Sequence, residues 1–113
     1  MSERDITLLL FDIKTAIENI LEFTKSYTFE QYKSDLKTRH AVERNFEIIG
    51  EAVSQIPEIY KDRHPQVGWR IIKDFRNFII HEYFGINDLI VWDTIQVRLP
   101  ELLRNISFLY KKV

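Results

Sequence analysis

The sequence predicts an all-α protein, folded as a four- to five-helix bundle in a single domain spanning residues 1–113. Apolar residues recur at steps of three and four over long stretches, which is the period of an amphipathic helix. Glycine and proline number only three each, too few for a turn-rich β protein. The chain has 113 residues, of which 45% are hydrophobic, so it has a common single-domain size and enough apolar residues for a core.

A long first helix is predicted from a wide apolar stripe over residues 6–21. Leu8, Phe11 and Phe23 lie outside this stripe. We therefore expect this helix to make contacts on a second side as well. Residues 27–34 are expected to form a connector that contains one short helical turn.

Two helices are predicted in the middle of the chain. The first covers residues 35–55, and Pro57 ends it, because proline lacks the backbone donor that a helix needs. Residues 61–65 are polar and end in proline, so they are expected to form a loop. The next helix is predicted over residues 66–84, with Gly85 in the left-handed conformation after its end.

The last helix has the most regular apolar pattern, a bundle seam over residues 92–109. Asn87 is placed to cap its start, and Ile86 and Val91 are placed for a hydrophobic staple. Pro100 lies off the seam. Its ring displaces a backbone hydrogen bond, so a kink is expected in this helix.

The composition narrows the possible kinds of site. The chain has no cysteine, which excludes disulfides and thiolate metal sites. His40, His64 and His81 are far apart in the sequence, and no metal-binding spacing occurs, so no metal or cofactor is expected. The first residues contain no basic stretch with a cleavage site, so a cytoplasmic location is expected.

The net charge is −1, but the basic residues are unevenly distributed. Residues 31–46 contain four basic and two acidic side chains, and residues 61–81 contain five basic and two acidic ones. Such stretches suit a polyanion, and they equally suit a solvated or structural helix face. Charge alone leaves both interpretations open.

The strongest candidate for chemistry lies in residues 74–84, where Arg76, His81 and Tyr83 interrupt an apolar helix. RNA cleavage needs few groups, because the 2′-hydroxyl is an internal nucleophile. Histidine transfers protons near neutral pH, and arginine binds phosphate while staying charged. Residues of these types could therefore cleave RNA.

Helix geometry favours a two-fold dimer. On an unbroken helix, Arg76 and His81 lie about 140° apart, so they can flank a cleft but cannot easily face one point. A dimer that juxtaposes two such helices would place two arginines and two histidines around one phosphate. A purely structural alternative stays open. The helix dipole favours a histidine in a last turn whatever its function, and Arg76 could simply pair with an acidic neighbour.

The run FRNFIIHEYF is similar to the R-x4-H-x-Y motif of HepT-like HEPN toxins, with Arg76, His81 and Tyr83 at its key positions. The runs AVERNFEIIGEAV and VWDTIQVRLPELL also resemble that family, so the resemblance covers nearly the whole chain. It implies a HEPN-type helical homodimer that is a metal-independent endoribonuclease toxin. It also implies a minimal nucleotidyltransferase as cognate antitoxin, which transfers AMP to Tyr83.

Further residues are assigned supporting parts. Asn77 could orient phosphate or the catalytic groups, against an ordinary helix-surface position. Arg39, His40 and Arg44 are candidates for contacts with the RNA backbone, against a solvated helix face. The alternative function is a non-catalytic helical module that binds a nucleotide or a nucleotidyltransferase. The motif is compatible with both functions.

Overall fold

The computed structural model describes residues 3–72, 75 and 88–112, and these residues form helices joined by short connections. The elements in chain order are α1 (Glu3–Thr24), α2 (Phe29–Ser34), α3 (Leu36–Gln55), α4 (Glu58–Arg63), the 3-10 turn η1 (Pro65–Val67), α6 (Asp88–Asp93), the π-helical segment η3 (Thr94–Arg98) and α7 (Leu99–Lys112). Residues 69–72 and 75 are also helical. The prediction of an all-α bundle is confirmed.

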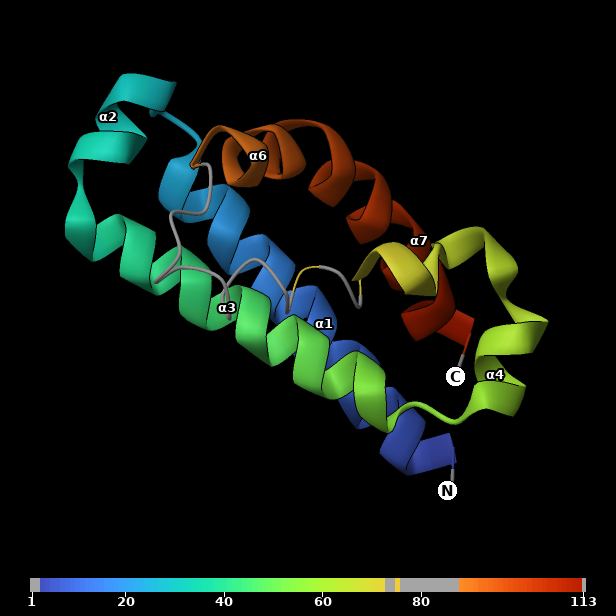
Figure 1. Cartoon of the computed structure of the whole chain (residues 1–113). Helices are drawn as coiled ribbons and strands as arrows, with labels where there is room; N and C mark the ends of the chain where they lie inside the picture. The colour runs from blue at the N-terminus through green and yellow to red at the C-terminus, as the bar shows by residue number, and fades with distance from the viewer. Residues whose placement is uncertain (1–2, 73–74, 76–87, 113) are drawn as a thin grey trace.

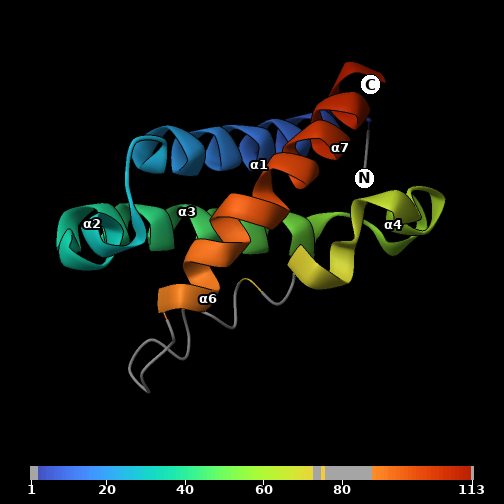
Figure 2. The same cartoon turned by 90° about the horizontal axis from the view of Figure 1, so that it is seen from above.

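The bundle is built around α1. This helix packs along α3 on one side and along α7 on another, while α2 contacts both α3 and α6 (Figure 1). Seen from above, α6 and α7 follow one another from the side of α2 toward the end of the molecule where both termini lie (Figure 2). None of the helices within the described ranges is both long and apolar enough to cross a membrane.

The first helix is formed as predicted. Its stripe faces the core, and Leu10, Ile13, Ile17 and Ile20 are completely buried. Of the residues outside the stripe, Phe11 lies with its ring centroid 6.1 Å from that of Tyr110 on α7. All three of these off-stripe residues nevertheless remain about half exposed within this chain.

Side-chain caps define where α2 and α3 begin. Thr28 and Gln31 form a reciprocal capping box at α2, which makes the expected short turn a proper helix. Asp35 caps α3 by accepting from the backbone N–H of Thr38. The Asp35 carboxylate also accepts from the Tyr27 hydroxyl at 2.6 Å and from the Thr38 hydroxyl at 2.7 Å. One carboxylate thus connects the chain before α2 to the first turn of α3.

This cap predicts a specific acid sensitivity. The hydrogen bonds from Tyr27 and Thr38 lower the pKa of Asp35 from 3.8 to about 2. A carboxyl whose pKa is lower in the folded state stabilises the fold above its unfolded pKa and loses that contribution as pH falls through the folded pKa. Melting temperatures measured by circular dichroism should therefore fall less between pH 4 and pH 2 in Asp35→Asn than in the wild type. Parallel curves would contradict this assignment.

Two sequence predictions in the middle of the chain are wrong. Residues 61–65 were expected to be a loop, yet α4 continues to Arg63. Glu58 in its first turn and Lys61 and Arg63 in its last turn suit the helix dipole, so a polar run here favours a short helix. The following helix begins after Gly68, not at residue 66. Gly68 has a φ of 70°, a left-handed conformation that separates η1 from the next helical turn.

The last helix is interrupted close to the expected place. Its seam is buried as predicted, but residues Thr94–Arg98 are π-helical, and the Leu99 N–H donates to the Thr94 carbonyl. Pro100 is the second residue of α7 and has no backbone N–H to donate to an earlier carbonyl. The wider π-helical turn before it accommodates this missing hydrogen bond. The remainder of the predicted third helix, with Gly85, Ile86 and Asn87, lies outside the described residues.

Candidate active site

The motif itself, with Arg76, Asn77, His81 and Tyr83, lies outside the described residues. The described residues that flank it are Phe75 before and Asp88 after. Each flanking residue contacts α3.

The anchor before the motif is apolar. Phe75 is 2% exposed, and its ring meets the Phe46 ring of α3 edge to face, with centroids 5.3 Å apart. Ile72, one turn earlier, is also buried. Aromatic pairs of this geometry contribute beyond their buried area, so this contact holds the chain against α3 immediately before Arg76.

The anchor after the motif is ionic. Asp88 is the first residue of α6, and its Oδ1 accepts from Nη2 of Arg39 on α3 at 3.3 Å. Both side chains are about three-quarters buried. The Trp92 ring of α6 also packs against the Tyr32 ring of α2, with centroids 5.4 Å apart. The start of α6 is therefore held by both α2 and α3.

The two anchors occupy neighbouring positions on one helix. Arg39 and Phe46 are seven residues apart on α3, which is two helical turns and about 10 Å of axial rise. At that spacing they share a face of the helix, within about 20° of one another. Phe75 and Asp88, the described residues before and after residues 76–87, thus both contact α3.

The three candidate RNA contacts on α3 fall into two groups. His40 and Arg44 are exposed, and four residues apart on a helix they share one face. Arg44 also lies 3.0 Å from the Glu47 carboxylate. Arg39 instead points to Asp88, and its Nε is buried with no hydrogen-bond partner among the described residues. Sequence reasoning missed Asp88, because a contact across 49 positions leaves no local pattern.

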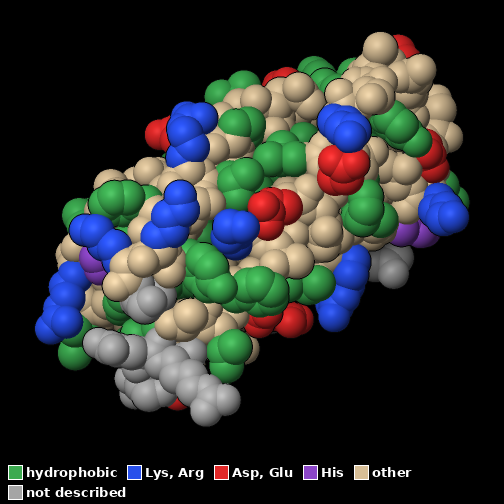
Figure 3. Space-filling view, turned by 180° about the vertical axis from the view of Figure 1, so that it is seen from behind, with side chains coloured by type: hydrophobic (Ala, Val, Ile, Leu, Met, Phe, Trp, Pro, Cys, Tyr) green, Lys and Arg blue, Asp and Glu red, His purple; other side chains and the backbone are tan. Residues whose placement is uncertain are grey.

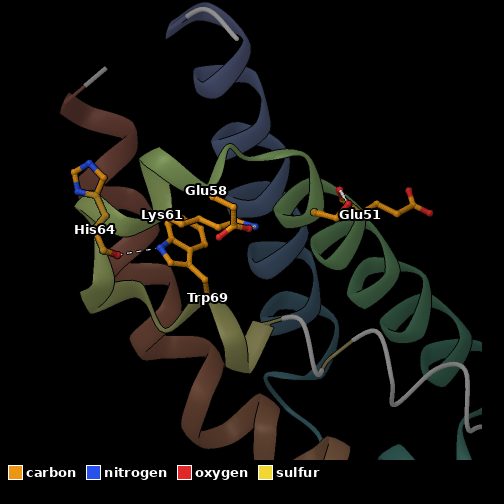
Figure 4. Close-up of polar contacts among 6 residues, drawn as sticks. Glu51, Glu58, Lys61, His64 and Trp69 are labelled. Atoms are coloured by element: carbon orange, nitrogen blue, oxygen red, sulfur yellow. Dashed lines mark hydrogen bonds and ion pairs between the residues drawn. The ribbon is translucent and has the colours of Figure 1, made fainter.

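A second polar cluster lies at the turn before the helical residues 69–72 (Figure 4). Trp69 donates from its indole Nε1 to the His64 carbonyl at 3.0 Å. The Tyr60 ring lies with its centroid 4.6 Å from that of His64 and 6.4 Å from that of Trp69, and burial raises the pKa of Tyr60. Lys61 lies 3.5 Å from Glu58 on the same helix. The contacts of Trp69 with His64 and Tyr60 hold α4 against the helical residues that begin at Trp69.

A small groove lies next to this turn, between residues 66–75 and α7. Its volume is about 140 Å³, and Val67, Ile72, Phe75 and Leu102 contribute to its lining. Pockets that hold drug-sized ligands have volumes of roughly 300–1,000 Å³. This groove is therefore too small to enclose a nucleotide.

Basic side chains gather toward one end of the described surface. From behind, Lys and Arg side chains are most frequent toward the end formed by α4 and the last turns of α7 (Figure 3). Arg63, Lys111 and Lys112 are exposed there. His40 and Arg44 are exposed on the first half of α3, the helix that follows α2. Within the described ranges, no three His, Asp or Glu side chains form a metal-binding group.

Comparisons with known proteins agree with the resemblance seen in the sequence. The family model "Ribonuclease HepT-like" matches residues 13–109. A protein of Methanocaldococcus jannaschii named "Putative RNase MJ0127" is 37% identical over 113 residues, which cover 100% of this chain and 93% of that protein. "Probable ribonuclease HepT" of Thermococcus cleftensis is 44% identical over 93 residues, which cover 82% of this chain and 84% of that protein.

No solved structure gave a significant match to this chain. The family match spans α3, both anchors of the motif segment and most of the last helix. It is accompanied by relatives whose similarity extends over nearly their whole length. The chain therefore belongs to the HepT-like ribonuclease family.

Proposed function

We propose that this protein is a metal-independent endoribonuclease and the toxin of a toxin–antitoxin pair. One observation carries the proposal: a chain of the HepT-like ribonuclease family contains an Arg76–His81 motif whose flanking residues both attach to α3. An RNA-cleaving activity is also what the names of its relatives state. We place the activity in the cytoplasm, where RNA is available.

The proposed reaction is an internal transesterification. One His81 takes the proton of the 2′-hydroxyl, whose oxygen then attacks the adjacent phosphorus. The bond to the 5′-oxygen breaks, and a protonated His81 supplies that leaving oxygen with a proton. The products are a 2′,3′-cyclic phosphate and a free 5′-hydroxyl. Arg76 stabilises the negative charge of the phosphorane through bidentate hydrogen bonds.

The two proton transfers favour a homodimer. One imidazole cannot act as base and acid at the same instant, so a two-fold pair of motifs supplies both groups. Asn77 is assigned to orienting the phosphate beside Arg76. His40 and Arg44 are assigned to RNA-backbone contacts, which their shared exposed face supports. Small-angle scattering that shows a monomer at micromolar concentration would contradict the composite site.

Control of the nuclease is assigned to a partner enzyme. A minimal nucleotidyltransferase would transfer AMP from ATP to the Tyr83 hydroxyl, which loses its proton while pyrophosphate leaves. The added group brings negative charge and bulk close to Arg76 and His81, where the RNA phosphate must bind. The toxin is silent in this modified form.

The product ends provide the test. Incubation with RNA in EDTA should leave 2′,3′-cyclic phosphates or their hydrolysis products, identified by mass spectrometry of the fragments. DNA and fully 2′-O-methylated RNA of the same sequence should remain intact, because neither offers the nucleophile. Cleavage that requires magnesium, or that cuts DNA equally, would overturn the mechanism. Binding of nucleotide or partner without any cleavage would identify a non-catalytic module instead.

A further inference from the structure

We infer that Arg39 is a positioning residue, whose ion pair with Asp88 sets where the motif segment joins α6. The inference rests on the proposed nuclease function. It gives Arg39 a positioning role in place of the contact with the RNA backbone that the sequence suggested. Arg39 and Asp88 are 49 positions apart in sequence, yet Nη2 and Oδ1 lie 3.3 Å apart. Arg39 thus connects α3 to the first described residue after the motif.

The surroundings of Arg39 make this contact a fixed one. The carboxylate of Asp35, one turn before Arg39, is held by Tyr27 and Thr38 and caps the start of α3. From the other side, α6 packs on α2 through the rings of Trp92 and Tyr32. Arg39 therefore projects from a capped helix end toward the first residue of α6, one turn before the residue that contacts α2. Little freedom remains for either member of the pair.

Burial makes the pair depend on both members. Arg39 and Asp88 are only 25% and 23% exposed, so water screens their attraction less than it screens an exposed pair. The Arg39 Nε is buried without a hydrogen-bond partner among the described residues. Removing Asp88 would leave a desolvated guanidinium without its counter-charge, which is more costly than losing an exposed ion pair. One buried contact can therefore determine the position of the start of α6.

The same geometry argues against a phosphate contact at Arg39. A bidentate contact with an RNA phosphate uses two donors of one guanidinium, and both must be open to the ligand. Arg39 has one donor engaged by Asp88 and its Nε donor enclosed by protein, so fewer donors remain for a phosphate than on an exposed arginine. His40 and Arg44, on the exposed face of the same helix, are the better-placed candidates. Arg39 acts on the reaction through the position of the motif, not through RNA.

Steady-state cleavage by single and double variants separates the two assignments. Arg39→Met and Asp88→Asn should each lower kcat by about 10-fold, a change of about 1.4 kcal/mol, while KM and its salt dependence stay near wild type. The double variant should be no worse than the poorer single variant, because both remove one interaction. Lys14→Met is a matched control, because it also breaks an ion pair, the 3.1 Å contact with Glu18 on α1. This variant should leave kcat unchanged.

A phosphate contact would give the opposite pattern. Arg39→Met would then raise KM and reduce the slope of log K against log salt by about 1, whereas Asp88→Asn would be harmless. That pattern would overturn the inference. Additive losses in the double variant would overturn it as well, because they would show that the two residues act independently.

Hydrogen exchange tests the contact without relying on catalysis. Amides in residues 88–93 should exchange at least 10-fold faster in Arg39→Met than in the wild type, whereas those of α1 should be unchanged. Unchanged exchange at α6 would refute the positioning role, whatever the kinetics show. If the wild-type dimer cleaves no RNA, the proposed function fails, and the exchange result still decides whether Arg39 fixes the start of α6.

Discussion

Replacing His81 or Arg76 by alanine should lower RNA cleavage by several orders of magnitude. A positioned acid or base contributes about 100- to 10,000-fold, and one group that stabilises transition-state charge contributes about 100- to 1,000-fold. The two losses should differ in kind. His81→Ala should abolish the dependence of the rate on pH near neutrality, because the titrating group is gone. Arg76→Ala should keep that dependence at a lower rate, because arginine stays charged throughout.

The control for these variants is an intact fold. Circular dichroism melting and scattering should show that each variant has the helix content and the oligomeric state of the wild type. A tenfold loss or less in both variants, with the fold preserved, would mean that neither side chain takes part in the chemistry. The motif would then serve a structural purpose.

Replacing Tyr83 by phenylalanine should have an equally large effect, but only in the presence of the partner. The variant loses the hydroxyl that accepts AMP and keeps the ring, so its own RNase activity should stay largely intact. Treatment with a cognate nucleotidyltransferase and ATP should silence the wild type and leave Tyr83→Phe active. Mass spectrometry should find one AMP adduct on wild-type Tyr83 and none on the variant.

The opposite result would assign Tyr83 a packing role. A buried tyrosine commonly packs its ring in the core and hydrogen-bonds a backbone carbonyl through its hydroxyl. If the partner silences the variant as readily as the wild type, with no adduct on either, neutralisation follows another route. Nuclease activity at Arg76 and His81 would be unaffected by that outcome.

Local patterns predicted most of the fold. The stripe of α1, the Asp35 start of α3 and the seam of α7 are regular enough to be read from spacing, because each buries one face against a common core. The short helix α4 was not predictable in the same way. Its polar residues resemble a loop, and it is held by contacts of Tyr60 with His64 and Trp69 that form only in the folded chain.

The candidate site, too, has one part that local patterns predict and another that depends on contacts between distant residues. The motif at Arg76 and His81 could be recognised because its residue types are rare in an apolar helix and because its flanking runs resemble a family. The anchors could not be recognised, since Phe46 looks like any core residue and Asp88 like any acid at a helix start. Pairings such as Arg39 with Asp88 depend on tertiary packing, about which spacing along the chain contains no information.

The most direct test of the central claim is RNA cleavage by the purified protein in EDTA, read on a denaturing gel beside His81→Ala prepared in the same way. We expect the wild type to convert total RNA into shorter fragments with the chelator present and His81→Ala to leave the RNA intact. Equal cleavage by both proteins would show that the activity does not come from this motif. Intact RNA in both lanes, with the wild type free of AMP, would contradict the assignment of RNase activity to this chain.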